Sequence, residues 1–210
     1  MSIKELLKQS FLYKILNNYR KAKLKKSIIV DWEKNGRPSP PPHVYKAFII
    51  KSYRDHFKIK NLIETGTYRG DMIRECISVF KRIISIELDE KLYQRAINTF
   101  DPKPNVKIYQ GDSGELMDKI LENVNERCLF WLDGHYSEGI TAKGELNTPI
   151  LKELEHIFKH PIKNHVILID DARAFNGSND YPNIIELEMF VKTNSFYAQF
   201  VVENDIIRIF

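Results

Sequence analysis

Acidic side chains follow five stretches of the sequence that have the composition of buried strands. These stretches are short, apolar and rich in Ile, Val, Leu and aromatic residues, which is typical of strands covered on both faces. In an open α/β sheet the carboxyl ends of the parallel strands share one edge, and ligands bind there. The acids at these strand ends are Glu64, Glu87, Asp112, Asp133 and the pair Asp170 and Asp171. The sequence therefore predicts an acidic site at one edge of a sheet.

The first of these strand ends carries two glycines in the spacing E-T-G-T-Y-R-G, which runs from Glu64 to Gly70. Gly66 and Gly70 allow the backbone to turn sharply and to approach a ligand closely. The spacing is not the G-x-G-x-x-G of dinucleotide enzymes, and an acid just before the first glycine disfavours a phosphate. It suits a cationic ligand such as S-adenosylmethionine, which carries a sulfonium and an amino group. The alternative is an ordinary turn between a strand and a helix.

Two further strand ends fit the remaining parts of such a ligand. Glu87 follows Gly66 by 21 positions, and an acid at about this distance, at the end of the second strand, commonly binds ribose hydroxyls. The turn Gly111-Asp112-Ser113 would border the adenine. The alternatives are helix capping by Glu87 and by Asp112 or Ser113.

This ordered series of strand ends resembles the class I S-adenosylmethionine-dependent methyltransferases over roughly residues 60–210. The resemblance implies a Rossmann-like α/β fold with a doubly wound, mostly parallel, seven-stranded sheet that closes in an antiparallel hairpin. It also implies S-adenosylmethionine as the cofactor. The cofactor-binding residues that it implies are Glu64, Thr65, Gly66, Thr67, Gly70, Glu87, Leu88, Gly111, Asp112, Ser113 and Asp133.

Three carboxylates at two neighbouring strand ends indicate a metal ion. Asp133 in FWLDGHYS and the pair Asp170 and Asp171 in ILIDDAR would repel one another unless a cation neutralised them. Magnesium takes oxygen ligands of this kind. The chain resembles the metal-dependent O-methyltransferases that act on sugars, the macrocin O-methyltransferase group, and this resemblance implies that the three aspartates hold Mg²⁺. The alternative is that some of them cap helices or pair with Arg173.

The predicted reaction is methylation of a sugar or glycoside hydroxyl in bacterial surface-glycan or secondary-metabolite synthesis, with Asp133 and His135 as catalytic residues. A divalent cation would lower the pKa of the acceptor oxygen, and His135, which can titrate near neutral pH, would remove its proton. The sugar-modifying relatives tend to carry Asp at this place, so a structural histidine is the alternative. Two other functions stay open, namely methyl transfer to a different acceptor and a non-catalytic binding domain on the same fold.

The predicted elements alternate between strands and helices, which favours a parallel sheet built from βαβ units. Strands are predicted near residues 61–66, 82–87, 106–111, 128–133 and 165–170. Helices are predicted near residues 43–58, 69–80, 90–99, 113–123, 146–159 and 182–193. The last two apolar stretches, SFYAQFVVE and DIIRIF, are separated by a short turn and predict an antiparallel hairpin.

The N-terminal segment differs from the rest of the chain in charge. Residues 1–27 hold eight of the 32 Lys and Arg but one of the 28 Asp and Glu, so their net charge is +7 and that of the remainder is −3. An amphipathic helix over 2–22 would lie on an anionic membrane surface, or pack on the domain or a partner with its lysines in solvent. A Pro-rich joint at 33–42 predicts a boundary between an appendage, 1–42, and a methyltransferase domain, 43–210.

Composition narrows the class of protein further. A mildly acidic domain argues against nucleic acid as a partner, so the expected partners are a small-molecule acceptor, most simply a carbohydrate, and a second copy of the chain. No apolar stretch approaches the roughly 18 residues that span a bilayer. Two cysteines, Cys76 and Cys128, are too few for a disulfide framework. The sequence predicts a cytoplasmic protein, with peripheral contact at the inner membrane surface through residues 1–27.

Overall fold

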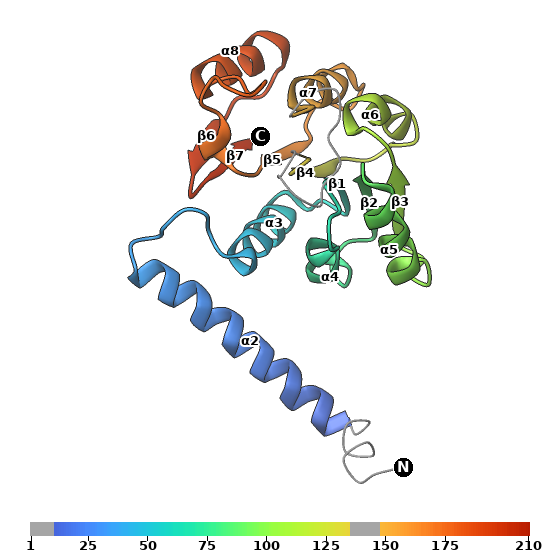
Figure 1. Cartoon of the computed structure of the whole chain (residues 1–210), viewed down its shortest axis with the longest axis vertical. Helices are drawn as coiled ribbons and strands as arrows, with labels where there is room; N and C mark the ends of the chain where they lie inside the picture. Colours follow the sequence, from blue (N-terminus) through green and yellow to red (C-terminus); the bar gives the residue numbers. More distant parts are fainter. Residues whose placement is uncertain (1–10, 135–147) are drawn as a thin grey trace. The chain divides into compact units, whose positions relative to one another are not determined.

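The computed structural model describes residues 11–134 and 148–210 of the chain. The chain divides into two compact units, Met1–Lys46 and Ala47–Phe210. The second unit contains every predicted site residue, and its centre is a single sheet (Figure 1).

The sheet has seven strands in the order β3-β2-β1-β4-β5-β7-β6. The strands are β1 (Asn61–Thr65), β2 (Arg82–Glu87), β3 (Val106–Gln110), β4 (Cys128–Leu132), β5 (Val166–Ile169), β6 (Phe200–Glu203) and β7 (Ile206–Ile209). The first five pair in parallel, whereas β7 pairs antiparallel with both β5 and β6. The predicted doubly wound sheet with a closing antiparallel hairpin is therefore confirmed, and each parallel strand begins and ends within about one residue of its predicted bounds.

Helices cover both faces of this sheet, as a βαβ chain with right-handed crossovers requires. They are α3 (His43–Phe57), α4 (Asp71–Cys76), α5 (Glu90–Phe100), α6 (Ser113–Leu121), α7 (Ile150–Lys159) and α8 (Ile184–Asn194), with a short 3₁₀ helix, η1 (Ala172–Ala174). Helices α6, α7 and α8 lie on one face, and α4 and α5 lie on the other (Figure 1).

Helix α4 is about half as long as the predicted 69–80. It begins only after Gly70, whose left-handed backbone (φ 72°) cannot continue a right-handed helix on its N-terminal side. It ends at Cys76 because the side chain of Asn105 donates hydrogen bonds to the carbonyl oxygens of Ile77 (2.9 Å) and Phe80 (3.1 Å). Those bonds satisfy the turn without a further helical turn.

Alternation of side chains along the strands divides the apolar residues between the two faces. Ile63, Phe130 and Ile167 pack with residues of α6, α7 and α8, such as Met117 and Leu154, in one buried cluster. The intervening residues of β1, β4 and β5 are also buried, so these central strands are covered on both faces, as the sequence indicated. The edge strand β3 differs, because Lys107 and Gln110 are exposed. In the central strands the buried polar residues lie near the carboxyl ends, where the site is expected.

In the first unit, α2 (Phe11–Lys34) extends well past the predicted end at residue 22. Residues 23–34 contain no Gly or Pro, so nothing in their sequence stops a helix before Gly36, whose φ is +82°. Leu16, Arg20, Leu24 and Ile28 follow one another at four-residue spacing, and all four are exposed. Basic and apolar side chains therefore share this row of the helix; residues 2–10, which carry part of the predicted amphipathic face, lie outside the described residues.

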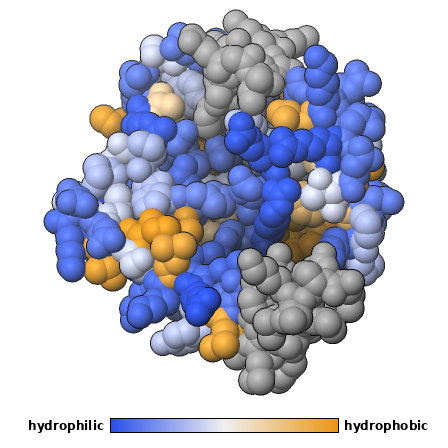
Figure 2. Space-filling view, turned by 60° about the horizontal axis from the view of Figure 1, so that its bottom comes forward, coloured by the Kyte–Doolittle hydropathy of each residue, from blue (hydrophilic) through white to orange (hydrophobic). Residues whose placement is uncertain are grey.

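The surface in Figure 2 is largely hydrophilic, and its apolar side chains form several separate groups. The most exposed large apolar side chains include Ile185 and Met189 on α8 and Phe196 after it. Within residues 11–134 and 148–210, every helix is too short or too polar to cross a membrane.

Candidate functional site

The predicted site residues meet at the carboxyl edge of the sheet. In the register of the parallel strands, Thr65 is the partner of both Ile86 and Leu132, and Leu132 is the partner of Ile169. The residues that follow these positions, among them Gly66, Glu87, Asp133 and Asp170, therefore come together at this edge. Polar side chains beside this edge form two clusters, the first around Glu64 and the second around Glu153. Alternation along β1 directs Glu64 of the first cluster and Thr65 of the second to opposite faces of the sheet.

The turn after β1 lies directly against the end of β4. Gly66 has φ +82°, and a Cβ at this position would lie 2.5 Å from the backbone oxygen of Asp133. The amides of Gly66 and Thr67 both donate to the carbonyl oxygen of Ile86, at 3.0 and 3.2 Å. Any residue other than glycine would therefore be strained and would also collide with backbone. The turn is held close to two neighbouring strand ends, as the predicted ligand loop requires.

At Gly70, the second glycine of the motif, a glycine is needed for a different structural reason. A Cβ at Gly70 would lie 2.4 Å from the ring of Phe100 on α5. Its φ of 72° also places it at the start of α4. The structure thus explains Gly70 by packing between α4 and α5, without any need for a ligand.

The first polar cluster, the Glu64 cluster, consists of Glu64, Thr67 and Ser85 and is buried. The hydroxyl of Ser85 donates to Glu64 Oε2 at 2.6 Å, and the hydroxyls of Ser85 and Thr67 lie 2.6 Å apart. Burial is the main reason why the pKa of Glu64 is raised to about 8, and the charges of Asp133 and Glu87 add to it. A carboxyl group with this pKa is largely neutral near pH 7, and a cation beside it would favour its ionised form.

Glu87 lies at the end of β2, on the same side as Ser85, and is buried. Its two carboxylate oxygens accept hydrogen bonds from the backbone amides of Tyr68 (2.7 Å) and Asp89 (2.9 Å). Burial raises the pKa of this carboxyl group despite these bonds. The helix-capping alternative does not apply to Glu87, because the side chain of Asp89 caps α5 by accepting from the amide of Leu92. The neighbouring Leu88 contributes its backbone oxygen to the side chain of Gln110.

The turn after β3 confirms the capping alternative for Asp112. Its side chain accepts from the amide of Gly114 at 2.8 Å and begins α6. Gly111 has φ +140°, and its amide donates to the carbonyl oxygen of Glu87, which ties this turn to the end of β2. Ser113 is buried and points away from the Glu64 cluster, toward α7.

The second polar cluster, the Glu153 cluster, consists of Thr65, Ser113 and Glu153. Ser113 donates to Glu153 Oε1 at 2.5 Å, and the hydroxyl of Thr65 also bonds to this carboxyl group. Glu153 is 1 % exposed, and burial raises its pKa to about 7. The sequence analysis missed Glu153, although a signal exists. It lies three residues after Ile150 and four before Ile157, on the apolar stripe of α7, where an acid is unexpected.

The three aspartates of the predicted metal site are adjacent, but they do not form such a site in the described part of the chain. Asp171 is paired with Arg173 at 2.8 Å, and Arg173 also pairs with Asp205. Asp170 accepts a hydrogen bond from the amide of Asp171. Among the described residues, no group of three His, Cys, Asp or Glu side chains is arranged to hold a metal ion. The donor set therefore does not fit Mg²⁺ as predicted, and the alternative that Asp171 pairs with Arg173 is confirmed.

The loop that follows β5 borders this edge of the sheet and carries Tyr181, whose hydroxyl bonds to the side chain of Thr148 and whose ring packs against Phe175. His135, the predicted base, and residues 136–147 lie outside the described residues. Burial is the main reason why the pKa of Tyr181 is raised to about 12, and the charges of Asp171, Asp133 and Glu153 add to it. Tyr181 therefore faces the acidic edge as a neutral hydroxyl.

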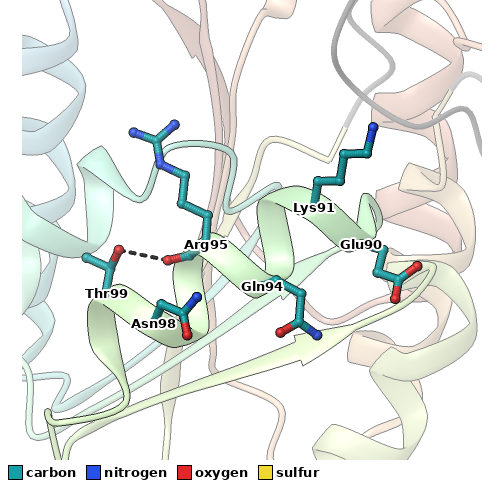
Figure 3. Close-up of a pocket in the computed structure, with 6 residues that line it drawn as sticks. All are labelled: Glu90, Lys91, Gln94, Arg95, Asn98 and Thr99. Atoms are coloured by element: carbon teal, nitrogen blue, oxygen red, sulfur yellow. Dashed lines mark hydrogen bonds between the residues drawn. The ribbon is translucent and has the colours of Figure 1, made fainter.

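Two hollows of the described surface lie elsewhere. One, of about 590 Å³, is lined by six residues of α5, from Glu90 to Thr99 (Figure 3). The other, of about 290 Å³, lies at the amino ends of the strands, beside Asn61, Arg82 and Cys128. The first is bordered by one helix and the second is at the opposite end of the strands from the polar clusters, so neither is the predicted site.

Comparisons with known proteins connect this arrangement to a fold. No family model matches the chain, and no curated protein matches it. Solved structures do match. An O-methyltransferase from Bacillus cereus in complex with SAH has a TM-score of 0.58 at 12 % identity, over 88 % of this chain and 89 % of that one.

Two further structures give the same result. An O-methyltransferase from Streptomyces achromogenes involved in tomaymycin synthesis, in complex with SAM, has a TM-score of 0.57 at 11 % identity, over 88 % of this chain and 87 % of that one. An SAH-bound methyltransferase from Podospora anserina has a TM-score of 0.56 at 16 % identity, over 92 % of this chain and 94 % of that one. The chain thus has the fold of S-adenosylmethionine-dependent O-methyltransferases.

Proposed function

We propose that this protein is an S-adenosylmethionine-dependent O-methyltransferase that acts on a hydroxyl group of a sugar or glycoside. The observation that carries the proposal is the turn at Gly66, pressed against the backbone of Asp133 between two buried carboxyl groups, Glu64 and Glu87. This turn lies at the carboxyl edge of a sheet whose fold is shared with solved complexes of SAM and SAH.

The residues of this edge suit the three parts of the cofactor. The Glu64 cluster would bind the cationic amino-acid end, because the cation would stabilise the ionised form of a carboxyl group whose pKa is otherwise about 8. Glu87 accepts backbone hydrogen bonds from Tyr68, Asp89 and Leu88, and a carboxylate, with about four lone-pair sites, can still accept from a ribose hydroxyl. The turn at Gly111, tied to Glu87, would border the adenine.

The chemistry required of the chain is then mainly orientation and proton removal. When bound, S-adenosylmethionine supplies a sulfonium methyl group, whose bond to sulfur breaks as a bond to the acceptor oxygen forms. The acceptor hydroxyl loses its proton, and His135 remains the predicted base for it. Because Asp171 pairs with Arg173 and Asp170 accepts from a backbone amide, the proposed reaction takes no step through a metal ion.

The acceptor side of the edge is polar and carries an aromatic ring. The neutral hydroxyl of Tyr181 lies near the charges of Asp133 and Asp171, and these groups can donate to and accept from adjacent hydroxyls of a sugar. The aromatic ring can pack on the apolar face of a sugar ring. The choice of a sugar over a phenol rests on this chemistry together with the sequence resemblance.

Two experiments test the proposal, a binding titration and an assay of methyl transfer. Isothermal calorimetry with S-adenosylmethionine, with NADH as the control ligand, should show one site per chain for the first and no binding for the second. A panel of sugars and catechols with a labelled methyl donor should then give label transfer to a sugar hydroxyl. Transfer to catechols alone would show that the acceptor is a phenol and not a sugar. Absence of cofactor binding would overturn the proposal.

A further inference from the structure

Glu153 is one of the most deeply buried carboxyl groups of the described chain, at 1 % exposed, and no step of the proposed reaction uses it. It lies in the first turn of α7, between the buried residues Ile150 and Leu154. A carboxyl group is costly to bury unless it is hydrogen-bonded. Its presence here therefore requires a reason other than apolar packing.

The contacts of Glu153 provide that reason, because they join three strand ends. Ser113, the first residue of the helix after β3, donates to Glu153 at 2.5 Å. Thr65 is the last residue of β1, and its hydroxyl bonds to Glu153 while also accepting from the amide of Asp133 at 3.3 Å. One carboxyl group on α7 thereby fixes a hydroxyl on each of two strand ends and, through Thr65, the end of β4.

Gly134 shows how closely these loops are packed. A Cβ at Gly134 would lie 3.0 Å from the hydroxyl oxygen of Thr65 and 3.3 Å from that of Ser113. The backbone after β4 therefore rests directly on the two hydroxyls that Glu153 holds. A shift of either hydroxyl would therefore move the backbone of Asp133 and Gly134.

We propose that Glu153 is a positioning residue of the cofactor site, which holds the loops after β1, β3 and β4 in their binding arrangement through the hydroxyls of Thr65 and Ser113. It does not touch the cofactor. This role rests on the proposed function, since it concerns the same edge of the sheet. The carboxylate can accept from both hydroxyls, whereas a protonated carboxyl group must use one oxygen as a donor.

The protonation of Glu153 should therefore affect the site. Burial raises its pKa to about 7, against the lowering effect of the bonds from Ser113 and Thr65. The other titratable groups that face it are Asp112 at the start of α6 and Tyr181 in the loop before α8. Deprotonation of Glu153 should tighten the three loops and hence cofactor binding as the pH rises through neutrality.

The test uses the full chain and three substitutions. Glu153→Leu removes both hydrogen bonds, Glu153→Gln keeps a neutral acceptor, and Glu155→Gln on the exposed side of α7 is the matched control. Calorimetry with S-adenosylmethionine should show about tenfold weaker binding for Glu153→Leu or worse, a smaller loss for Glu153→Gln, and no change for the control. Between about pH 6 and pH 7.5, the affinity of Glu153→Gln should vary less than that of the wild type.

A second readout does not need the cofactor. Amide hydrogen exchange should become faster at residues 65–67, 112–114 and 133–134 in Glu153→Leu and not in Glu155→Gln. Should Glu153→Leu fail to fold, Ser113→Ala removes the 2.5 Å bond from the other side and should give the same local increase. Unchanged exchange at all three loops would overturn the positioning role. Faster exchange in Glu153→Leu together with absence of cofactor binding by the wild type would overturn the proposed function and leave only the contacts that hold the loops.

Discussion

Ser85 donates a 2.6 Å hydrogen bond to Glu64, its partner across the β1–β2 register, and both residues are buried at the carboxyl end of the sheet. A serine thus holds a carboxyl group in a place where its charge is costly. The arrangement makes sense if a cation binds beside Glu64, because the charge is then neutralised when the site is occupied.

Replacing Glu64 by Gln should raise the stability of the protein at high pH and weaken its binding of the cofactor. Folding raises the pKa of Glu64 from 4.5 to about 8, so the folded state binds more protons than the unfolded state within this window. The stability of the ligand-free protein therefore falls as the pH rises from about 4.5 to 8, and Glu64→Gln should remove this loss near its upper end. At about pH 8 the variant should melt at a higher temperature and bind S-adenosylmethionine roughly tenfold or more weakly.

Thermal melts and calorimetry measure these two quantities on the same samples. Glu122→Gln, at an exposed position after α6, is the control and should change neither. Wild-type affinity in Glu64→Gln at pH 8 would show that Glu64 does not bind the cationic end of the cofactor.

Two glycine substitutions should separate the cost of a strained backbone from the cost of a collision between residue 66 and the backbone of Asp133. Gly66 and Gly36 both have φ +82°, but a Cβ at Gly66 would lie 2.5 Å from backbone, whereas nothing lies within 4 Å of one at Gly36. Gly36→Ala should cost about 1 kcal/mol, since it carries the conformational strain alone. Gly66→Ala should cost more and should abolish cofactor binding, because the turn has to move away from Asp133.

Chemical denaturation gives the free energy of unfolding of both variants, and calorimetry gives their affinity for the cofactor. If Gly66→Ala cost no more than Gly36→Ala and still bound S-adenosylmethionine, the close approach to Asp133 would have no functional meaning.

The sequence predicted the sheet well because its central parallel strands, β1, β2, β4 and β5, are covered on both faces and are therefore mostly apolar. The ends of the helices were less predictable. The end of α4 depends on the side chain of Asn105, which lies about 30 residues away in sequence, and no local pattern contains that contact. Helix α2 extends to Lys34 because an exposed helix needs no apolar period to continue.

The site was predicted in part, for a similar reason. Residues at or directly after strand ends, such as Glu87 and Gly66, could be placed from strand order alone. Partners from distant elements could not: Glu153 reaches the site from α7, and Arg173 pairs with Asp205 from the closing hairpin. The sequence offered pairing with Arg173 as an alternative to the metal site, and strand order does not decide between the two.

A substitution of Arg173 tests whether its guanidinium group occupies the place of a magnesium ion. Arg173→Gln leaves Asp171 and Asp205 without their common partner. Because the Arg173 side chain is 45 % exposed while that of Asp205 is only 5 % exposed, the loss in stability should exceed the ~1 kcal/mol of an exposed ion pair. Removal of the guanidinium should increase the affinity for Mg²⁺, since it competes for the same carboxylate.

Calorimetric titration with MgCl₂ measures this affinity in both proteins. Arg37→Gln, which breaks an exposed ion pair with Glu33, is the control. Equal Mg²⁺ affinity in the wild type and in Arg173→Gln would show that Arg173 does not occupy the place of a metal ion.

A buried histidine pair at the other end of the sheet predicts acid sensitivity. His165 Nδ1 accepts from the amide of Cys128 at 3.0 Å, and its Nε2 lies 3.1 Å from His160 Nδ1. Burial, and then the charge of His160, lower the pKa of His165 from 6.5 to about 4. The unfolded state binds the additional proton, so stability is fully present above about pH 6.5 and is lost toward pH 4, by roughly 3 kcal/mol.

Denaturation at a series of pH values should show this loss in the wild type and a smaller one in His165→Asn. His43→Asn, at an exposed position, should behave as the wild type. The same loss between pH 6.5 and 4 in His165→Asn would assign the acid sensitivity to other groups.

The central claim is that the acidic edge around Gly66 and Glu64 binds S-adenosylmethionine. Calorimetric titration of the wild-type protein near pH 8 tests it most directly, with Gly66→Ala measured beside it. We predict binding at one site per chain for the wild type and none for Gly66→Ala. Absence of binding by the wild type, or equal binding by both proteins, would contradict the account of this site.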